Sequence, residues 1–305
     1  MKLRNTTSGK ILRKIILAIV ALVVLAGLAV LVAFSVTHTR LTRTFSLQVP
    51  TVVVTSDAAS VERCRHLATI SGCMDCHGKD FAGTVVINDA VVGHLSGPNL
   101  TRGKGGLPTD YSDLDYVRAI RHGIARNGRP LLLMPSFDYM GLSDEDLGAL
   151  IAFLKSVPAV DRPSGVVEPG PLMKVLIAVG EMKIDAARID HGAKRPVSVA
   201  AEPTAEYGRY LSASCSGCHG TNFAGGKIPG APPDWPLAPN LTPATGAFMS
   251  QASAADFMHV LRTRTLPDGR QLSPVMPVGF GQMTDLELTA LYNYLKTVPA
   301  VAVKK

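Results

Sequence analysis

The stretch Cys73-Met74-Asp75-Cys76-His77 decides how this chain folds, and it recurs as Cys215-Ser216-Gly217-Cys218-His219. Both stretches read C-x-x-C-H, the spacing typical of covalent attachment of a c-type haem. Two thiols one helical turn apart can each form a thioether with a haem vinyl group. The His that follows then lies under the iron and binds it from the proximal side. The two motifs therefore predict two covalently bound haem c groups in one chain.

The cysteine count leaves few other uses for these pairs. Four of the five cysteines lie in the motifs, so only Cys64 remains and no disulfide framework is possible within one chain. A zinc ribbon needs its second Cys pair about 15–20 residues after the first, whereas the motifs here begin at residues 73 and 215. A redox dithiol does not require the trailing His. Both alternatives fit less well than haem attachment.

The charge of the chain is concentrated near its N-terminus. The 305 residues have a formal charge of +7, and five of the 31 basic residues lie within residues 1–14, which hold no acidic residue. The rest of the chain balances 26 Lys and Arg against 24 Asp and Glu. Binding of nucleic acid needs a basic face on the folded part, and the composition gives no sign of one.

An apolar segment near the N-terminus predicts a membrane anchor. Ile15 to Thr37 carries no charge, and Ile15 to Phe34 is almost wholly aliphatic, about the 20 residues that span a bilayer. A cleaved signal peptide, the alternative, has a shorter apolar core of roughly 7–15 residues and a small-residue cleavage site. The preceding Lys and Arg residues place the N-terminus in the cytoplasm. The sequence thus predicts a single-pass protein of the bacterial inner membrane, with the haem domains in the periplasm.

Repeated segments indicate an internal duplication. Pro98-Asn99-Leu100-Thr101 recurs as Pro239-Asn240-Leu241-Thr242, and Val157-Pro158-Ala159-Val160 recurs as Val298-Pro299-Ala300-Val301. The region between the copies is either an ordered connector, with a helix from Pro171 to Ile189, or a loose linker. We divide the chain into a basic tail, transmembrane helix (about 15–37) and tether over 1–56, a first haem domain over 57–160, the connector over 161–202, and a second haem domain over 203–305.

Two methionines occupy the same place in both copies. Met134 and Met276 each precede a Pro, and each lies 57 residues after the motif His (77 to 134 and 219 to 276). A Pro-flanked loop ahead of the last helix can fold over the distal face of a haem. Core filling, the ordinary role of Met, suits the Met residues that lack such a counterpart. We therefore predict the axial pairs His77/Met134 and His219/Met276, and such His/Met ligation raises the reduction potential.

Each copy resembles a class I cytochrome c domain in its order of N-terminal helix, C-x-x-C-H, P-N-L loop, Met-Pro loop and C-terminal helix. The stretches Tyr111 to Val160 and Ala252 to Val301 are similar to the cytochrome c subunits of membrane-bound periplasmic dehydrogenases acting on alcohols, aldehydes or sugar acids. Those subunits commonly carry three haem domains, whereas this chain has two. The resemblance implies an all-α fold, in which an N-terminal transmembrane helix precedes two class I cytochrome c domains related by duplication.

The resemblance also implies hydrogen bonds behind each proximal His. In this family the carbonyl of the P-N-L proline accepts a hydrogen bond from the ring N–H of that His. The accepting residues would be Pro98 for His77 and Pro239 for His219. Such a bond selects the tautomer and the ring orientation of a metal-binding His.

Four further positions have expected roles. The first and last helices of such domains cross at a small residue, which the alignment of the two copies places at Cys64 and Gly208. Arg129 and Arg270 are candidates for contacts to haem propionates, because Arg binds carboxylates in a bidentate manner. The alternative for both Arg residues is an exposed turn.

These observations predict an electron-transfer protein and not an enzyme. Two occupied axial positions leave little room for a substrate at either iron. The expected partners are electron donor and acceptor proteins, among them a periplasmic dehydrogenase subunit or a component of the respiratory chain. The alternative is a haem enzyme of the di-haem peroxidase type, in which a labile Met leaves the iron. A haem-based sensor is a third interpretation.

Overall fold

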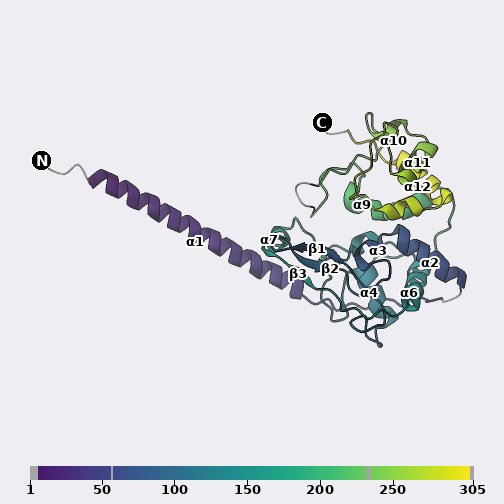
Figure 1. The fold of residues 1–305 in the computed structure, drawn as a ribbon, viewed down its shortest axis with the longest axis horizontal. Coiled ribbons are helices and arrows are strands. Elements are labelled where there is room, and N and C mark those ends of the chain that lie inside the picture. The colour runs from purple at the N-terminus through teal and green to yellow at the C-terminus, as the bar shows by residue number, and fades with distance from the viewer. Residues whose placement is uncertain (1–5, 56–57, 230, 232–234, 303–305) are drawn as a thin grey trace.

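The computed structural model describes residues 6–55, 58–229, 231 and 235–302 (Figure 1). The tail residues Lys2 and Arg4 and the predicted domain boundary at residue 57 lie outside them. The N-terminal part contains α1 (Thr6–Thr42), α2 (Ala58–Ile70), α3 (Cys73–His77), β1 (Val85–Asp89), β2 (Gly93–Ser96), α4 (Asp113–His122), α5 (Ser136–Tyr139), α6 (Asp144–Ser156), β3 (Val167–Pro169), α7 (Pro171–Val179) and η1 (Asp185–Ala187). The C-terminal part contains α8 (Ala205–Leu211), α9 (Ala213–His219), α10 (Phe248–Gln251), α11 (Ala254–Thr263), η2 (Val278–Gln282) and α12 (Asp285–Thr297).

The helix α1 projects away from the rest of the molecule (Figure 1). Its 37 residues extend over about 55 Å at 1.5 Å per residue. An 18-residue window within its segment Gly9–Thr42 has a mean hydropathy of 3.3, and this is the one helix among the described residues that is long and apolar enough to cross a membrane. The helix ends at Thr42 and not near Thr37, so the start of the predicted tether is helical.

The first unit packs α2, α3, α4, α5 and α6 around one apolar core, to which Cys64, Tyr116 and Leu147 contribute. The second unit repeats this order with α8, α9, α11 and α12, and its core includes Leu211 and Leu288. The mostly helical fold with two similar units agrees with the all-α prediction. The two units are also in direct contact, because side chains of α2 pack within the core of the second unit.

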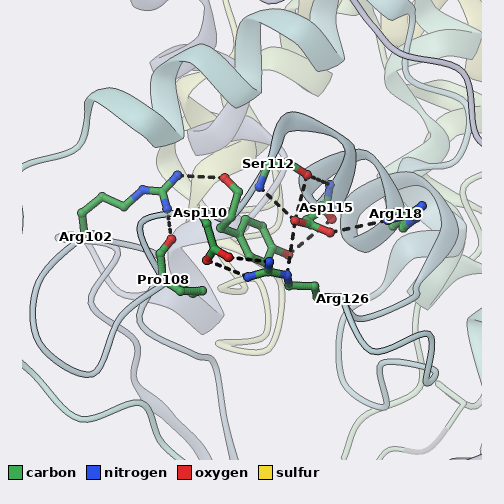
Figure 2. A network of polar contacts seen from close by, with 8 residues as sticks. Arg102, Pro108, Asp110, Ser112, Asp115, Arg118 and Arg126 are labelled. Carbon is green, nitrogen blue, oxygen red and sulfur yellow. Dashed lines mark hydrogen bonds and ion pairs between the residues drawn. The ribbon is translucent and has the colours of Figure 1, made fainter.

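A polar network fixes the start of α4 in the first unit (Figure 2). Ser112 and Asp115 form a capping box, in which each side chain accepts the backbone N–H of the other residue. Arg126 donates to both carboxylate oxygens of Asp110 at 2.8 and 2.7 Å, and its Nε lies 3.8 Å from Asp115. Arg102 donates to two carbonyl groups of the same loop. The loop that follows the P-N-L segment is thereby tied to α4.

A small antiparallel sheet, which the sequence patterns do not predict, lies beside the first unit. Its strand order is β1-β2-β3, and β3 comes from the connector. Glu168 of β3 pairs with His94 of β2. The connector therefore adds a strand to a hairpin of the first unit, and its first part is ordered.

The connector helix α7 begins at Pro171 as predicted but is shorter than predicted. It ends at Val179, because Gly180 adopts a φ of 83° and terminates the helix in a left-handed conformation. Met173 and Ile177 of α7 pack in a third apolar cluster with residues of the sheet and of the loop after α4. The connector is thus packed against the first unit and is not a loose linker.

The tether after α1 also runs along the first unit. Val49, Val52 and Val54 pack against its core, and the Phe45 N–H donates to the Gly128 carbonyl at 2.8 Å. A Cβ on Gly148 of α6 would lie 2.0 Å from the Val53 carbonyl oxygen. This close crossing requires a glycine in α6 and joins the anchor firmly to the first unit.

Candidate haem sites

Each C-x-x-C-H motif ends a short helix, α3 in the first unit and α9 in the second. His77 Nδ1 lies 3.0 Å from the Pro98 carbonyl oxygen, and His219 Nδ1 lies 2.8 Å from the Pro239 carbonyl oxygen. Because a carbonyl oxygen only accepts, Nδ1 of each ring carries the proton. Nε2 of each ring is then left with a free lone pair, the form in which His binds a metal.

The pKa shifts of the motif His and Cys side chains favour the neutral form of each side chain. Burial lowers the pKa of His77 and His219, although the hydrogen bond to proline acts in the opposite direction. Burial also raises the pKa of Cys73 and Cys215 to about 12, whereas reactive dithiols and zinc sites need thiolates. Within the described part of the chain, no group of three or more His, Cys, Asp or Glu side chains is placed to hold a metal ion.

The repeated P-N-L and V-P-A-V segments contact each other in both units. Asn99 Nδ2 donates to the Val160 carbonyl at 3.0 Å, and Asn240 Nδ2 donates to the Val301 carbonyl at 2.8 Å. A Cβ on Gly97 would lie 1.9 Å from the Cys76 carbonyl oxygen, so the loop passes directly behind the motif. The end of each unit therefore holds the loop that orients the motif His.

In the second unit, the motif and the predicted axial Met line one cavity of about 940 Å³. Cys215, Cys218, His219 and Met276 are among its lining residues, and most of the remainder is apolar, with Phe257, Val260, Leu291 and Leu295 as examples. This volume is near the upper end of the range of about 300–1,000 Å³ for small-molecule sites. The residues present therefore fit a large apolar cofactor held by two thiols, a His and a Met.

In the first unit, two of the equivalent residues pack against the core of that unit. Cys73 and Met134 both pack against the cluster that includes Tyr116 and Leu150. Met134 lies just before α5, where the Ser136 N–H donates to the Met134 carbonyl at 2.9 Å. The first unit thus also brings its motif and its predicted axial Met to one core.

Arg264 holds the loop of Met276, a role that the sequence patterns do not reveal. It ends α11 in a left-handed conformation with φ 60°, which is costly for a residue with a Cβ. Its guanidinium donates to the carbonyls of Met276 and Ser273 at 2.9 and 2.7 Å. In the first unit, Gly123 ends α4 with φ 66°. The two copies differ at this position, because one has a helix-terminating glycine and the other has an arginine. This difference is the sequence signal that identifies Arg264.

The two predicted propionate contacts lie on exposed turns. Arg270 lines the cavity of the second unit, but its guanidinium also pairs with Asp268 at 2.6 Å and its side chain is 76% exposed. Arg129 is exposed on the equivalent turn of the first unit. The structure thus places only Arg270 beside a described cavity.

The helix α5 lies between the two motifs. The Tyr139 hydroxyl donates to the Ser71 carbonyl, two residues before the first motif, at 2.6 Å. Its neighbour Asp138 lies near Ser216 of the second motif, and burial together with the Asp185 carboxylate raises the pKa of Asp138 to about 7. A Cβ on Gly217 would lie 2.6 Å from Asp138 Oδ2. The loop that carries Met134 therefore leads into α5, and α5 contacts the motif of the second unit.

Comparison with protein families identifies both units. Residues 205–299 match the cytochrome c family. Residues 61–154 match the family described as cytochrome c oxidase, cbb3-type, subunit III. Each match begins near the first helix of a unit and extends into or beyond its last helix, so both families cover a motif and a predicted axial Met.

Related proteins are cytochrome subunits of dehydrogenases. The fructose dehydrogenase cytochrome subunit of Gluconobacter japonicus is 29% identical over 262 residues, which cover 80% of this chain and 53% of that protein. The gluconate 2-dehydrogenase cytochrome c subunit of Pantoea cypripedii is 28% identical and covers 79% and 60% of the two chains. The cytochrome c subunit of the quinone-dependent alcohol dehydrogenase of Gluconobacter oxydans is 24% identical and covers 81% and 56%.

The chain thus spans 53–60% of the length of these three relatives. All three are cytochrome subunits, and none is described as a peroxidase or as a catalytic subunit. The family matches and these relatives identify this chain as a protein with two cytochrome c domains, homologous to the cytochrome c subunits of dehydrogenases.

Proposed function

We propose that this chain is a membrane-anchored di-haem c-type cytochrome that transfers electrons between a redox partner and an acceptor. Two equivalent sites with the same donor set support this function. Each offers a Cys pair, a His with a free Nε2, and a Met in a loop on the same core. The residues that would hold the cofactors are Cys73, Cys76, Cys215 and Cys218 at the vinyl groups and His77, Met134, His219 and Met276 at the irons.

The protein orients these ligands and excludes water from them. A bound haem c supplies one-electron redox chemistry, and the His/Met ligands raise its potential. The Pro98 and Pro239 carbonyls hold each His ring in one tautomer. In the second unit, Arg264 keeps the Met276 loop in place over a mainly apolar cavity. Arg270, together with Arg129 on the equivalent turn, is the candidate for the propionates.

Electron transfer between the two sites would pass through the contact of α5 with α9. α5 follows Met134 directly and packs against the helix that carries the second motif. Tyr139 and Asp138 contact the surroundings of the first and second motifs, respectively. This contact gives a short route within one chain, so that one site can accept electrons while the other delivers them.

The names of the relatives indicate the partner. They are subunits of fructose, gluconate and alcohol dehydrogenases, so the electron donor of this chain would be a periplasmic dehydrogenase subunit and the acceptor a component of the respiratory chain. α1 would cross the inner membrane with its N-terminus in the cytoplasm and both haem domains, at about 57–160 and 203–305, in the periplasm. An uncleaved N-terminus on the membrane-bound protein is expected, and a mature protein that begins after residue 37 would contradict the anchor.

Haem content tests the proposal most directly. A pyridine haemochrome assay should give two c-type haems per chain. The double substitution Cys215→Ala and Cys218→Ala should reduce this to one, whereas Cys64→Ala, the matched control outside the motifs, should leave two. One haem in the unmodified chain would refute the di-haem assignment.

The axial Met assignment needs a spectroscopic test. Met276→Ala should remove the near-infrared Met–iron band of one haem and lower its potential, and Met134→Ala should do the same for the other. Met283, which is buried in the core of the second unit, provides the control. If Met283→Leu removes the band and Met276→Ala does not, the assignment is wrong.

A further inference from the structure

The connector helix α7 lies beside the end of the anchor helix α1. The Thr37 hydroxyl donates to the Lys174 carbonyl at 2.5 Å, and Arg40 donates to the Ile177 carbonyl. The Lys174 ammonium lies 5.0 Å from the centre of the Phe34 ring. Since positions 37 and 40 meet positions 174 and 177, both helices run in the same direction. The N-terminal end of α7 therefore points toward the apolar segment of α1.

Apolar side chains are exposed at this end of α7. Leu172 is 42% exposed, and Val91, in the turn between β1 and β2, is 56% exposed. The Leu172 N–H donates to the Val91 carbonyl, so the two residues are neighbours. The opposite side of α7, with Met173 and Ile177, is already buried in the third apolar cluster. Leu172 and Val91, together with the neighbouring Pro171, thus form a small apolar tip that the described residues leave uncovered.

The level of this tip relative to α1 indicates which surroundings its exposed side chains face. The aliphatic segment of α1 ends at Phe34, and by the pairing of the two helices Leu172 lies within about one turn of this level. The cationic side chains of Lys174, Arg40 and Arg43 lie at the level of Phe34 or nearer the C-terminal end of α1. An apolar surface next to Lys and Arg at the end of a transmembrane segment is typical of the membrane interface, where apolar side chains meet lipid chains and cationic groups reach the head groups.

We propose that the tip formed by Val91, Pro171 and Leu172 inserts into the outer face of the same bilayer that α1 crosses. The surface is continuous with the exposed apolar side chains of α1, and Figure 1 shows α7 at the edge of the molecule nearest the free length of that helix. The insertion attaches the first unit to the membrane at a second point. It rests on the proposed anchoring function of α1.

Photocrosslinking of the full-length protein in native membranes tests this contact. The photoreactive amino acid p-benzoylphenylalanine is placed at position 172 or at position 91 in separate variants. Position 278, where Val278 is 63% exposed in the second unit, is the water-exposed control, and position 25, where Leu25 is 63% exposed in α1, is the lipid control. We expect the mass of one phospholipid to be added at positions 172, 91 and 25 but not at position 278.

Each other result overturns the inference in a different way. A protein adduct at positions 172 and 91 would show that a partner subunit covers the tip. The absence of an adduct at these positions, with a lipid adduct at position 25, would show that the tip faces water while the anchor holds. The absence of a lipid adduct at position 25 would refute the anchor and, with it, the second attachment.

Discussion

The two units meet through equivalent positions that carry different chemistry. His66 on α2 occupies the place of Tyr210 on α8, and Asp146 at the start of α6 is equivalent to Glu287 at the start of α12. His66 Nε2 lies 2.8 Å from Glu287 Oε2, and the Tyr210 hydroxyl donates to Asp146 Oδ2 at 2.6 Å. The first helix of each unit therefore forms a hydrogen bond with the carboxylate at the start of the last helix of the other unit.

This arrangement is the one expected of a two-fold contact between identical subunits, here within a single chain. The two halves of the contact nevertheless differ in their response to pH. His66 can change charge near neutral pH. Burial, and then the charge of Asp146, raise the pKa of Tyr210 so that its hydroxyl stays neutral. One half of the contact is thus sensitive to pH and the other is not.

The crossing of the first and last helices also differs between the units. A Cβ on Gly208 would lie 1.9 Å from the Ala290 carbonyl oxygen and 2.8 Å from Tyr294 Cβ. In the first unit the equivalent position holds Cys64, whose side chain is completely buried. The helices α8 and α12 approach too closely for any side chain, whereas α2 and α6 leave room for one.

Gly208→Ala is expected to have the largest effect on stability. The added methyl group meets backbone on α12, which cannot move aside as a flexible side chain would, and overpacking of this kind costs about 3 kcal/mol of unfolding free energy. Urea unfolding in detergent, followed by far-ultraviolet circular dichroism, measures the loss. Cys64→Ala is the matched control, with an expected loss of about 1 kcal/mol. Equal losses in both variants would contradict the difference between the crossings.

Asp146→Ala should have the next largest effect, because it breaks the half of the contact in which the Tyr210 hydroxyl donates. The carboxylate accepts from Tyr210 and, at 2.8 Å, from Arg63. Its removal leaves the Tyr210 hydroxyl buried without this acceptor, at a cost of about 2 kcal/mol. The same unfolding experiment should show this loss unchanged across neutral pH. A loss that varies strongly with pH would contradict the assignment of this half as insensitive.

His66→Asn should remove the pH-sensitive half of the contact. The hydrogen bond to Glu287 raises the pKa of His66 despite burial. For Glu287, burial raises the pKa, but the hydrogen bonds from His66 and Thr284 outweigh it, and the pKa is lowered. The His66 contribution is complete below about pH 6.5 and is lost as pH rises through the raised pKa. The Glu287 contribution is present above about pH 4.3 and is lost as pH falls through the lowered pKa.

The pair therefore stabilises the protein most between about pH 4.3 and 6.5. The difference in unfolding free energy between the native chain and His66→Asn should be about 1 kcal/mol in this window and should decrease toward alkaline pH. Denaturation at a series of pH values measures it. A difference that increases with pH would contradict the sign derived from these shifts.

Short-range patterns predicted most of the fold. The duplication follows from repeated sequence segments, and the two units have equivalent last helices, α6 after Ser143 and α12 after Thr284. The motifs and Met134 and Met276 follow from spacing, and their assignment as haem ligands stays a prediction. The sheet could not be predicted in this way, because β3 is separated by many residues from β2, with which it pairs. The apolar stripe of α7 continues beyond Gly180 and predicts a longer helix, but the backbone turns at Gly180 and ends it.

The contact between the units was also not predictable from local patterns. The sequence Ser143-x-x-Asp146 suggests a capping box, but the Asp146 carboxylate is used by Arg63 and by Tyr210 of the other unit. The Ser143 N–H instead donates to the Tyr210 hydroxyl at 3.1 Å. A side chain from one unit thus completes the helix cap of the other, and only the three-dimensional arrangement of the two units reveals it.

Arg264→Gly should have the smallest effect on stability but a selective effect on the second site. The substitution gives the second unit the residue that ends α4 in the first, Gly123, and relieves the left-handed backbone strain of about 1 kcal/mol. It also removes the two hydrogen bonds to the Met276 loop, each of which contributes about 0.5 kcal/mol because the half-buried guanidinium can bond to water instead. The gain and loss largely offset each other in the unfolding free energy.

The loop itself, however, loses the contacts that keep Met276 in position. We therefore expect the near-infrared Met–iron band of one haem to weaken and that haem to bind carbon monoxide when reduced, while the other haem is unchanged. Arg264→Lys, which keeps the charge and the strained backbone but lacks the forked donor, should show the same spectroscopic change with a larger loss of stability. If the glycine variant retains a native band, the Met276 loop is held by its own packing, and the difference between Gly123 and Arg264 has no consequence for the ligand.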